Sequence, residues 1–321
     1  MNRDRWNWTR WIYPIVGLLL LTFALYTCQK ELNRYSLDDI LGGFALISDR
    51  QLACALCFAF TGYFVISTYD LVAFRQLNHY LSRKRILFTT FITYAVSNTT
   101  GFTLLIGGGI RYRFYSCWGV PARIVATITA LGNLTFWLGL LTLVGITFVL
   151  NPLQLPQSLR ISTVVMQCLG VTALFLVGTY LYFCWRKKGL RVRGKIWRFP
   201  QPSIPVLQIV VFSLDWALAA AVLYCLIPSY PHQSYLQFFS IYQLGMAASI
   251  MSNIPGGIGV FETVIIFLLP KSIFTPDILS SLLVYRSIRF LLPLAIASIL
   301  VCCFELRQKL RQRWRSKTRN K

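Results

Sequence analysis

Long apolar runs constrain this chain more than any other feature of its sequence. The hydrocarbon core of a bilayer is about 30 Å thick, and an α-helix needs roughly 20 apolar residues to cross it. Six unbroken runs reach about this length, at residues 11–28, 52–74, 124–150, 161–184, 205–227 and 278–304. Only 13% of the 321 residues are charged, and most of the charge lies between the runs. The sequence therefore predicts an all-α integral membrane protein with six full transmembrane helices, forming one polytopic domain over residues 1–321.

The positive charge is distributed unevenly between the connections. The formal net charge is +22, and most of the 32 lysines and arginines lie at residues 1–10, 75–85, 111–123, 186–198 and 307–321. This is the positive-inside pattern, so membrane topology explains the charge and no nucleic-acid partner is expected. We expect a multi-pass protein of a bacterial-type inner (plasma) membrane. Its N-terminus and a basic tail at residues 306–321 are expected in the cytoplasm.

Two further apolar regions, at residues 86–109 and 238–270, are interrupted by turn-forming residues. A single crossing by either region would place neighbouring connections on the side that the positive-inside rule forbids. We therefore expect two broken, re-entrant hairpins. The expected turn residues are Ser97, Asn98 and Gly101 in the first hairpin, and Ser252, Asn253, Pro255, Gly256 and Gly257 in the second.

The two turns share the pattern Ser-Asn-x-x-Gly and are separated by three spans, which inverts the direction of entry. Two like elements inserted from opposite faces are typical of an inverted repeat, an architecture that builds transporters with a central site. The alternative is two ordinary hairpins whose turn residues agree by coincidence. Interrupted backbone at membrane depth is tolerated where it is buried in protein or lines a watery cavity, so the turns are candidate parts of a site.

A charged residue inside an apolar run costs about 2.5–3.5 kcal/mol on insertion scales, so each one requires a reason. Asp215 lies near the middle of its run and is either a substrate-binding residue or a structural partner for an arginine. Arg286 and Arg289 are three residues apart and share one face of a helix. Two roles fit them and do not exclude each other: binding a lipid phosphate through bidentate contacts, and pairing with Asp215 and Glu262.

Charged residues that border the broken segments form a second group of candidates. Arg111 and Arg113 follow the first hairpin and either grip a headgroup at the cytoplasmic entrance or serve as positive-inside anchors. Glu262 begins the second leg of the second hairpin and either favours a cationic headgroup or neutralises an arginine. Asp70 lies near the cytoplasmic end of its span, where we expect a structural role.

Two longer motifs resemble those of a known family. The first is Ala-Val-Ser-Asn at 95–98 followed by Arg-Tyr-Arg-Phe-Tyr-Ser-Cys-Trp-Gly at 111–119; the second is Ser-Asn-Ile-Pro-Gly-Gly-Ile-Gly-Val-Phe-Glu at 252–262. With Arg286, Arg289 and Leu292-Pro293, they resemble the transmembrane domain of the lysylphosphatidylglycerol synthetase/flippase proteins. The resemblance implies that this chain corresponds to the flippase half of those two-part proteins, as a stand-alone inner-membrane version without the soluble synthetase domain. It implies lipid handling and gives no support for lysyl transfer.

The function we expect is that of a flippase-like lipid transporter for a phospholipid or a lipid-linked headgroup. Its expected partners are membrane lipids, above all anionic phospholipid. One alternative is a membrane subunit that recruits a soluble lipid-modifying enzyme through its basic tail, and another is an integral lipid transferase. We expect no enzyme activity, cofactor or metal site. The sequence has no G-x-x-x-x-G-K-[ST] loop, so transport would be passive, ion-coupled or driven by a partner.

Overall fold

The computed structural model describes residues 42, 45, 47–100, 103–150, 162–186, 190–192, 195–197, 200–227, 234–252, 255–269 and 275–319. Within these residues, five helical segments are long and apolar enough to cross a membrane: Asp49–Gln76, Ala122–Leu150, Thr163–Arg186, Ser203–Leu226 and Asp277–Gln308. They coincide with five of the six expected runs, which confirms the all-α membrane class. The expected span at residues 11–28 lies outside the described residues.

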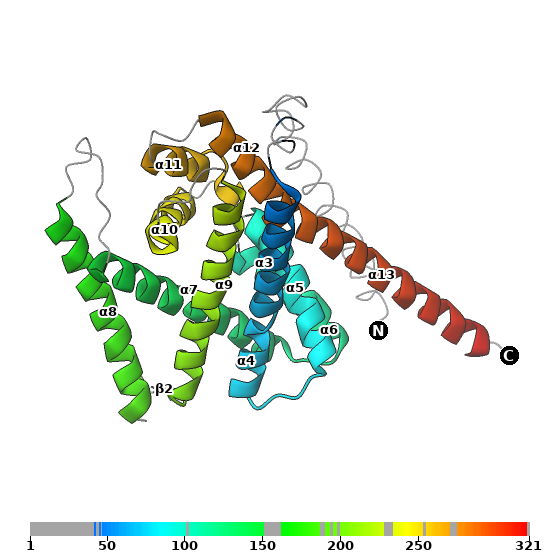
Figure 1. The fold of residues 1–321 in the computed structure, drawn as a ribbon. Helices are drawn as coiled ribbons and strands as arrows, with labels where there is room; N and C mark the ends of the chain where they lie inside the picture. Colours follow the sequence, from blue (N-terminus) through cyan, green and yellow to red (C-terminus); the bar gives the residue numbers. More distant parts are fainter. Residues whose placement is uncertain are drawn as a thin grey trace.

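The first hairpin follows the span made of α3 (Asp49–Ser67) and α4 (Tyr69–Gln76). It consists of α5 (Arg83–Thr100) and α6 (Thr103–Cys117), which pack side by side. The Thr90 hydroxyl in the first half of α5 lies 3.5 Å from the Tyr115 hydroxyl near the end of α6. The two helices are therefore antiparallel, and the expected hairpin is confirmed (Figure 1).

The expected position of the first turn was wrong by a few residues. Ser97 and Asn98 lie within α5, which continues to Thr100, and α6 begins at Thr103. Gly101 lies outside the described residues. The two threonines at the end of α5 bond back to helix carbonyls: the Thr99 hydroxyl donates to the Ala95 carbonyl at 3.0 Å and the Thr100 hydroxyl to the Ser97 carbonyl at 3.3 Å. These polar side chains are accommodated within the helix, whereas the sequence pattern suggested that they would break it.

The second hairpin follows α9 (Ser203–Leu226) and consists of α10 (Tyr235–Met251), the short 3₁₀ turn η3 (Pro255–Gly257) and α11 (Val260–Leu268). The reversal uses left-handed backbone at Gly256 (φ 64°), Gly257 (φ 60°) and Gly259 (φ 85°), which glycine adopts without a steric penalty. The expected turn at 255–257 is confirmed. Ser252 ends α10 as its C-cap, and Asn253 lies outside the described residues.

The two hairpins enter from opposite sides and their tips touch. Helices α3 and α9 pack against each other and run in opposite directions, and each hairpin begins where its preceding span ends (Figure 1). A side chain at Gly256 would place its Cβ 2.9 Å from the Thr99 carbonyl oxygen at the end of α5. This arrangement of two oppositely inserted hairpins is the one that an inverted repeat produces.

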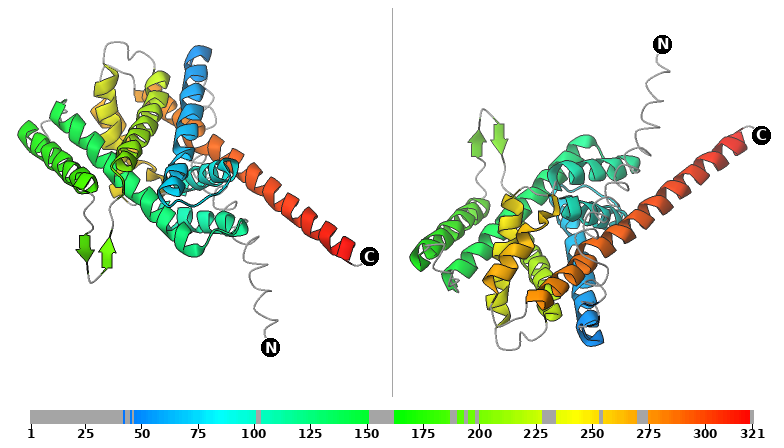
Figure 2. Two further views of the ribbon diagram at one scale, coloured as in Figure 1. Left: turned by 90° about the horizontal axis from the view of Figure 1, so that it is seen from below. Right: turned by 90° about the horizontal axis from the view of Figure 1, so that it is seen from above.

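In sequence, the two halves are separated by α7 (Ala122–Leu150) and α8 (Thr163–Arg186). They cross closely, because a Cβ at Gly170 would lie 3.0 Å from the Gly145 carbonyl oxygen. A two-stranded antiparallel hairpin, β1 (Leu190–Val192) with β2 (Lys195–Trp197), follows α8 and projects from the body (Figure 2). The all-α expectation had no place for these strands.

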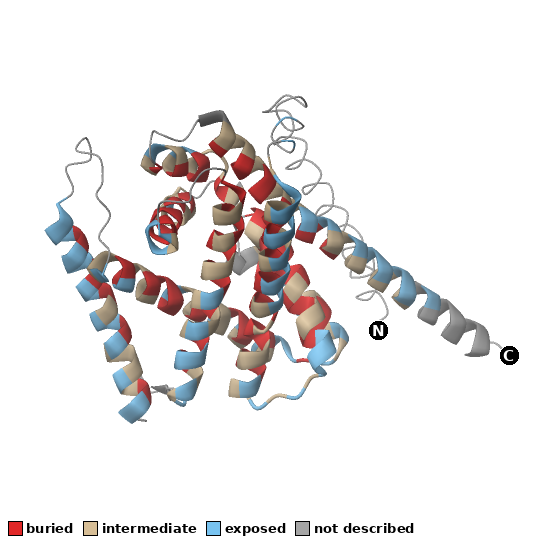
Figure 3. Cartoon of the chain, viewed as in Figure 1, coloured by how far each residue is buried: buried red, intermediate tan, exposed pale blue. Residues whose placement is uncertain are grey.

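The last span is formed by α12 (Thr275–Arg286), the π-helical turn η4 (Ser287–Leu291) and α13 (Leu292–Arg319). Buried residues gather where the helices face one another, and α8 is largely exposed (Figure 3). Large apolar side chains point outward, as Phe175 does with 70% exposure, while several charged side chains are buried inside. This distribution suits a lipid environment and places the polar groups at the centre of the bundle.

Candidate functional site

The first buried charge pair joins α4 to the second leg of the first hairpin. Arg111 donates from Nε to both carboxylate oxygens of Asp70, at 3.2 and 2.9 Å, and from Nη2 to Oδ1 at 2.8 Å. The Tyr115 hydroxyl donates to the same carboxylate at 2.7 Å. Gly107 leaves room beside this pair, because a Cβ there would lie 3.3 Å from Arg111 Nη1. The Asp70 carboxylate thus accepts four hydrogen bonds, which suits a structural role in holding α6 against α4.

The second buried charge pair joins α9 to η4. Arg289 donates from Nη2 to Asp215 Oδ1 at 2.9 Å, and both side chains are almost fully buried. Arg289 Nη1 has no hydrogen-bond partner among the described residues, although it is shielded from solvent. The pair is therefore less completely satisfied than the Asp70–Arg111 pair. An unmet guanidinium donor in a low-dielectric interior is costly, so it marks a place where a ligand or water oxygen would be stabilised.

Tyr63 on α3 supports Arg289 in two ways. Its ring lies beneath the guanidinium, with the Arg289 Cζ 4.7 Å from the ring centroid. Its hydroxyl donates to the Arg289 main-chain carbonyl at 3.0 Å. Pro293, four residues later, cannot supply the N–H that an α-helix would offer to this carbonyl. Sequence reasoning did not select Tyr63, since nothing local to α3 indicates either contact.

The third pair holds the tip of the second hairpin. Arg286 forms an ion pair with Glu262, the first-turn acid of α11. Its other nitrogens donate to the carbonyl oxygens of Gly256 and Gly257, at 3.3 and 3.4 Å. Glu262 also accepts from the Gly259 N–H at 2.8 Å. One guanidinium from α12 thus fastens the glycine turn that touches Thr99.

The fourth pair lies at the base of the first hairpin. Arg113 on α6 pairs with Glu305 on α13, and both are partly exposed. Phe304 packs next to this pair against Phe114 and Trp118, with ring centroids 5.3 and 5.9 Å away. Because α12, η4 and α13 form one continuous helix, the chain that fastens the second hairpin through Arg286 also contacts the first hairpin through Glu305.

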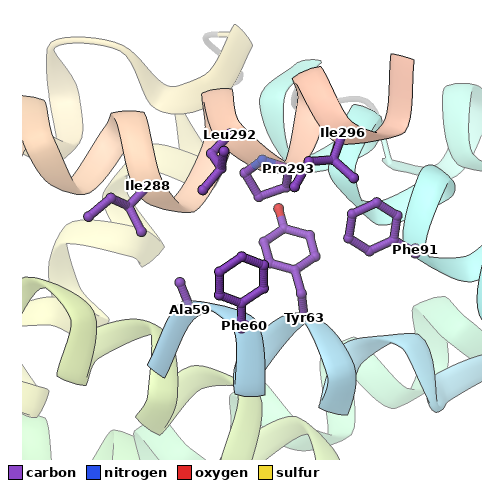
Figure 4. Close-up of a pocket in the computed structure, with 8 residues that line it drawn as sticks. All are labelled: Ala59, Phe60, Tyr63, Phe91, Ile288, Leu292, Pro293 and Ile296. Carbon is purple, nitrogen blue, oxygen red and sulfur yellow. The ribbon is translucent and has the colours of Figure 1, made fainter. Parts of the chain in front are cut away.

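An apolar groove lies at Tyr63 (Figure 4). It lies between α3, α5 and the η4–α13 junction. Its lining residues are Ala59, Phe60, Tyr63, Phe91, Ile288, Leu292, Pro293 and Ile296. Tyr63 is the residue shared by the groove and the charge pair.

The predicted site residues therefore do not form a single cluster. Arg289 pairs with Asp215 and Arg286 with Glu262, the arrangement that was one of the two alternatives for these arginines. Arg111, for which headgroup binding and positive-inside anchoring were the two alternatives, has a side chain that is 2% exposed and bound to Asp70. The structural role expected for Asp70 matches its place in the first pair. Glu305, Tyr63 and Tyr115 complete these contacts and were not predicted.

Comparison with known proteins shows which family this chain matches. The sequence profile of the lysylphosphatidylglycerol synthase TM region matches residues 11–297. The chain is 39% identical over 302 residues to an uncharacterised protein of Synechocystis sp., with 93% of each chain covered. It is 30% identical over 321 residues to the inner membrane protein YbhN of Escherichia coli, with 98% of each covered.

A third relative is the phosphatidylglycerol lysyltransferase of Staphylococcus aureus, which is 26% identical over 284 residues. That match covers 88% of this chain and 32% of the lysyltransferase. The shared part is thus the membrane-embedded region that the family profile describes. The chain belongs to the family of lysylphosphatidylglycerol synthase transmembrane regions.

Proposed function

We propose that this protein is a flippase-like transporter that moves the headgroup of a phospholipid or lipid-linked precursor across or within the membrane. The observation that carries the proposal is the meeting of the two hairpin tips, where Gly256 abuts the Thr99 carbonyl inside the bundle. Broken helices from two inverted halves that meet near the middle of a membrane are where transporters place their binding sites. Irregular backbone at that depth needs protein or a watery cavity around it.

The charges near the second tip suit an anionic headgroup. In this proposal Arg286 and Arg289 are the phosphate-binding residues, and Asp215 and Glu262 hold them in place when no lipid is bound. Arginine suits this task because its planar fork binds phosphate oxygens in pairs. Arg289 Nη1, which has no partner among the described residues, is available without breaking an existing bond. The name of the Staphylococcus aureus relative, which refers to phosphatidylglycerol, supports an anionic phospholipid as the partner.

The other two arginines have different roles in this proposal. Arg111 is a structural residue of the first hairpin, because three of its hydrogen bonds are already committed to Asp70. Arg113, which is 14% exposed, is placed to meet a headgroup at the base of that hairpin. Inner-membrane location with cytoplasmic termini is also proposed, supported by the positive-inside pattern and by the name of the Escherichia coli relative.

Transport is favoured over catalysis by the state of the buried carboxylates. Each buried carboxylate in the described part of the chain, Asp70, Asp215 and Glu262, is engaged with an arginine. A lipid transferase of the metal-dependent kind needs acidic oxygens free to hold Mg²⁺. Carboxylates that neutralise buried arginines cannot serve that purpose without leaving a buried charge unpaired.

The proposal is tested by leaflet exchange of labelled lipids in proteoliposomes. We expect wild-type protein to accelerate exchange of an anionic phospholipid, and Arg286→Ala and Asp215→Ala to abolish the acceleration while the protein still elutes as a monodisperse peak. Lys84→Ala is the matched control, because Lys84 is a basic residue on the exposed start of α5. Exchange no faster than in protein-free vesicles, for anionic, lysylated and prenyl-linked lipids alike, would contradict the proposal.

A second role, recruitment of a soluble enzyme, is favoured by one observation. Helix α13 continues to Arg319 and its last turns extend beyond the helical body (Figures 1 and 2). Residues 307–321 contain eight basic and no acidic residues, so the extension offers a docking site for an acidic surface. Charge reversal within 311–319 separates the roles, since a transporter tolerates it and a recruiting subunit loses its partner.

A further inference from the structure

We propose that the groove between α3, α5 and the η4–α13 junction binds one acyl chain of a membrane lipid. We propose further that Tyr63 is the positioning residue that links the bound acyl chain to the Asp215–Arg289 pair. The proposal rests on the lipid-handling function above and adds to it the place of the hydrocarbon part of the lipid. Nothing in the sequence motifs or in the relatives assigns such a site.

The chemistry of the groove selects a hydrocarbon chain. Seven of its eight lining residues are apolar, and the eighth, Tyr63, presents its ring to the groove while its hydroxyl is bonded to the Arg289 carbonyl (Figure 4). The groove belongs to two spans, Asp49–Gln76 and Asp277–Gln308, and Phe60 on its wall is 59% exposed on the outer surface of the bundle. In a bilayer that surface faces lipid tails, so the molecules that reach the groove laterally are alkyl chains.

The lining of the groove does not suit a polar headgroup. A headgroup placed there would leave its hydrogen-bonding groups unmet against apolar side chains, which is costly. A methylene chain has no such groups.

Tyr63 connects the groove to the charges because one side chain takes part in both. Its ring lines the groove and lies 4.7 Å from the Arg289 Cζ, and its hydroxyl donates to the Arg289 carbonyl at 3.0 Å. An acyl chain in the groove would therefore contact the side chain that supports Arg289. The π-helical turn Ser287–Leu291 around Arg289 is a point where the helix accommodates a shift of this residue, because π-turns interrupt the regular ladder.

The site is tested by photo-crosslinking with a phosphatidylglycerol that carries a diazirine near the middle of one acyl chain. We expect adducts in the purified, reconstituted protein to concentrate on Phe60, Phe91 and Ile296 relative to Phe175, a lipid-facing residue of α8 that lines no groove. Filling the groove by Ala59→Val and Ala59→Leu should lower these adducts in steps, by at least about fivefold for leucine, and leave Phe175 labelling unchanged. Equal labelling of the groove and of Phe175 overturns the site.

The link is tested by Tyr63→Phe, which keeps the ring and removes the hydroxyl. We expect groove labelling to persist while leaflet exchange slows about tenfold, the size expected for leaving one buried acceptor unmet. Tyr182→Phe is the matched control: Tyr182 also stacks under an arginine and accepts its hydrogen bond, from Arg186 at 2.9 Å, on exposed α8. Wild-type exchange in Tyr63→Phe overturns the positioning role.

The two proposals fail in different ways. Groove adducts in a protein that shows no leaflet exchange leave the acyl-chain site in place and remove the transporter function. Exchange without groove adducts keeps the transporter and removes the site. If Ala59→Leu fails to elute as a monodisperse peak, the milder Ala59→Val variant decides the matter by its adduct yield.

Discussion

Arg111 donates three hydrogen bonds to the carboxylate of Asp70, across 41 residues of sequence, with both side chains buried in the bundle. The pair ties the span before the first hairpin to the second leg of that hairpin. In the other half of the molecule, Asp215 and Arg289 tie the span before the second hairpin to the helix that follows it, through one hydrogen bond. Both halves thus contain a buried aspartate–arginine pair, but the first pair has three hydrogen bonds between its side chains and the second has one. This difference suits a rigid first pair and a second pair that can rearrange.

We expect Asp70→Ala to destabilise the protein by about 3–5 kcal/mol, because it leaves the Arg111 charge buried without a partner. The measurement is reversible unfolding in mixed detergent micelles, followed by circular dichroism. The double variant Asp70→Leu/Arg111→Leu should be less destabilised than the sum of the single changes, since neither charge is then stranded. Wild-type stability in Asp70→Ala would show that the pair contributes nothing to the fold.

Neutralising the two aspartates should separate stability from transport. Asp70 accepts four hydrogen bonds and Asp215 accepts one from Arg289, so we expect Asp70→Asn to lower the melting temperature more than Asp215→Asn. Asp215→Asn should instead cause the larger loss of leaflet exchange among correctly folded protein. Both variants are to be measured in the same thermal ramp and the same vesicles. The reverse order in both assays would contradict a structural role for the Asp70–Arg111 pair and a transport role for the Asp215–Arg289 pair.

A methyl group at the tip of the second hairpin should be harmful. Gly256 has φ of 64°, and a Cβ there would lie 2.9 Å from the Thr99 carbonyl oxygen. We expect Gly256→Ala to cost about 1–3 kcal/mol from the strained backbone, with the tip displaced from Thr99 as well. Gly109→Ala on α6 is the control, because a Cβ there meets nothing within 4 Å and should be tolerated. Equal unfolding midpoints for the two variants would mean that the tips do not pack as described.

Glu262 should stabilise the turn at Gly256 and Gly257 through its ion pair with Arg286. We expect Glu262→Gln to weaken its ion pair with Arg286 and to speed backbone hydrogen exchange in residues 255–262, where Arg286 bonds two glycine carbonyls. Mass spectrometry of peptic fragments measures this. Asp49→Asn is the control, since Asp49 is also a first-turn acid but lies exposed at the start of α3. Unchanged exchange in this segment would show that the tip is held by packing alone.

The membrane class and the two broken segments follow from properties that can be read along the chain. Apolar length determines which segments cross a hydrocarbon layer, and the alternation of basic connections shows where a region must turn back. Gly256 and Gly257 were identifiable because few residues other than glycine adopt left-handed backbone. The same reasoning misplaced Ser97 and Asn98, because residues that favour turns are also accommodated inside helices; both lie within α5.

Sequence alone thus determined that the chain is a membrane protein, that two apolar regions return on themselves and that a few charges lie at membrane depth. Only the tertiary structure decided that Arg111 belongs to Asp70, that Arg289 belongs to Asp215, and that Tyr63 serves both a charge pair and a groove. The physical reason is that hydrophobic length and charge asymmetry are local quantities. The partner of a buried side chain depends on how each helix is rotated and packed against helices far away in sequence, and that is decided by the packing of the whole bundle.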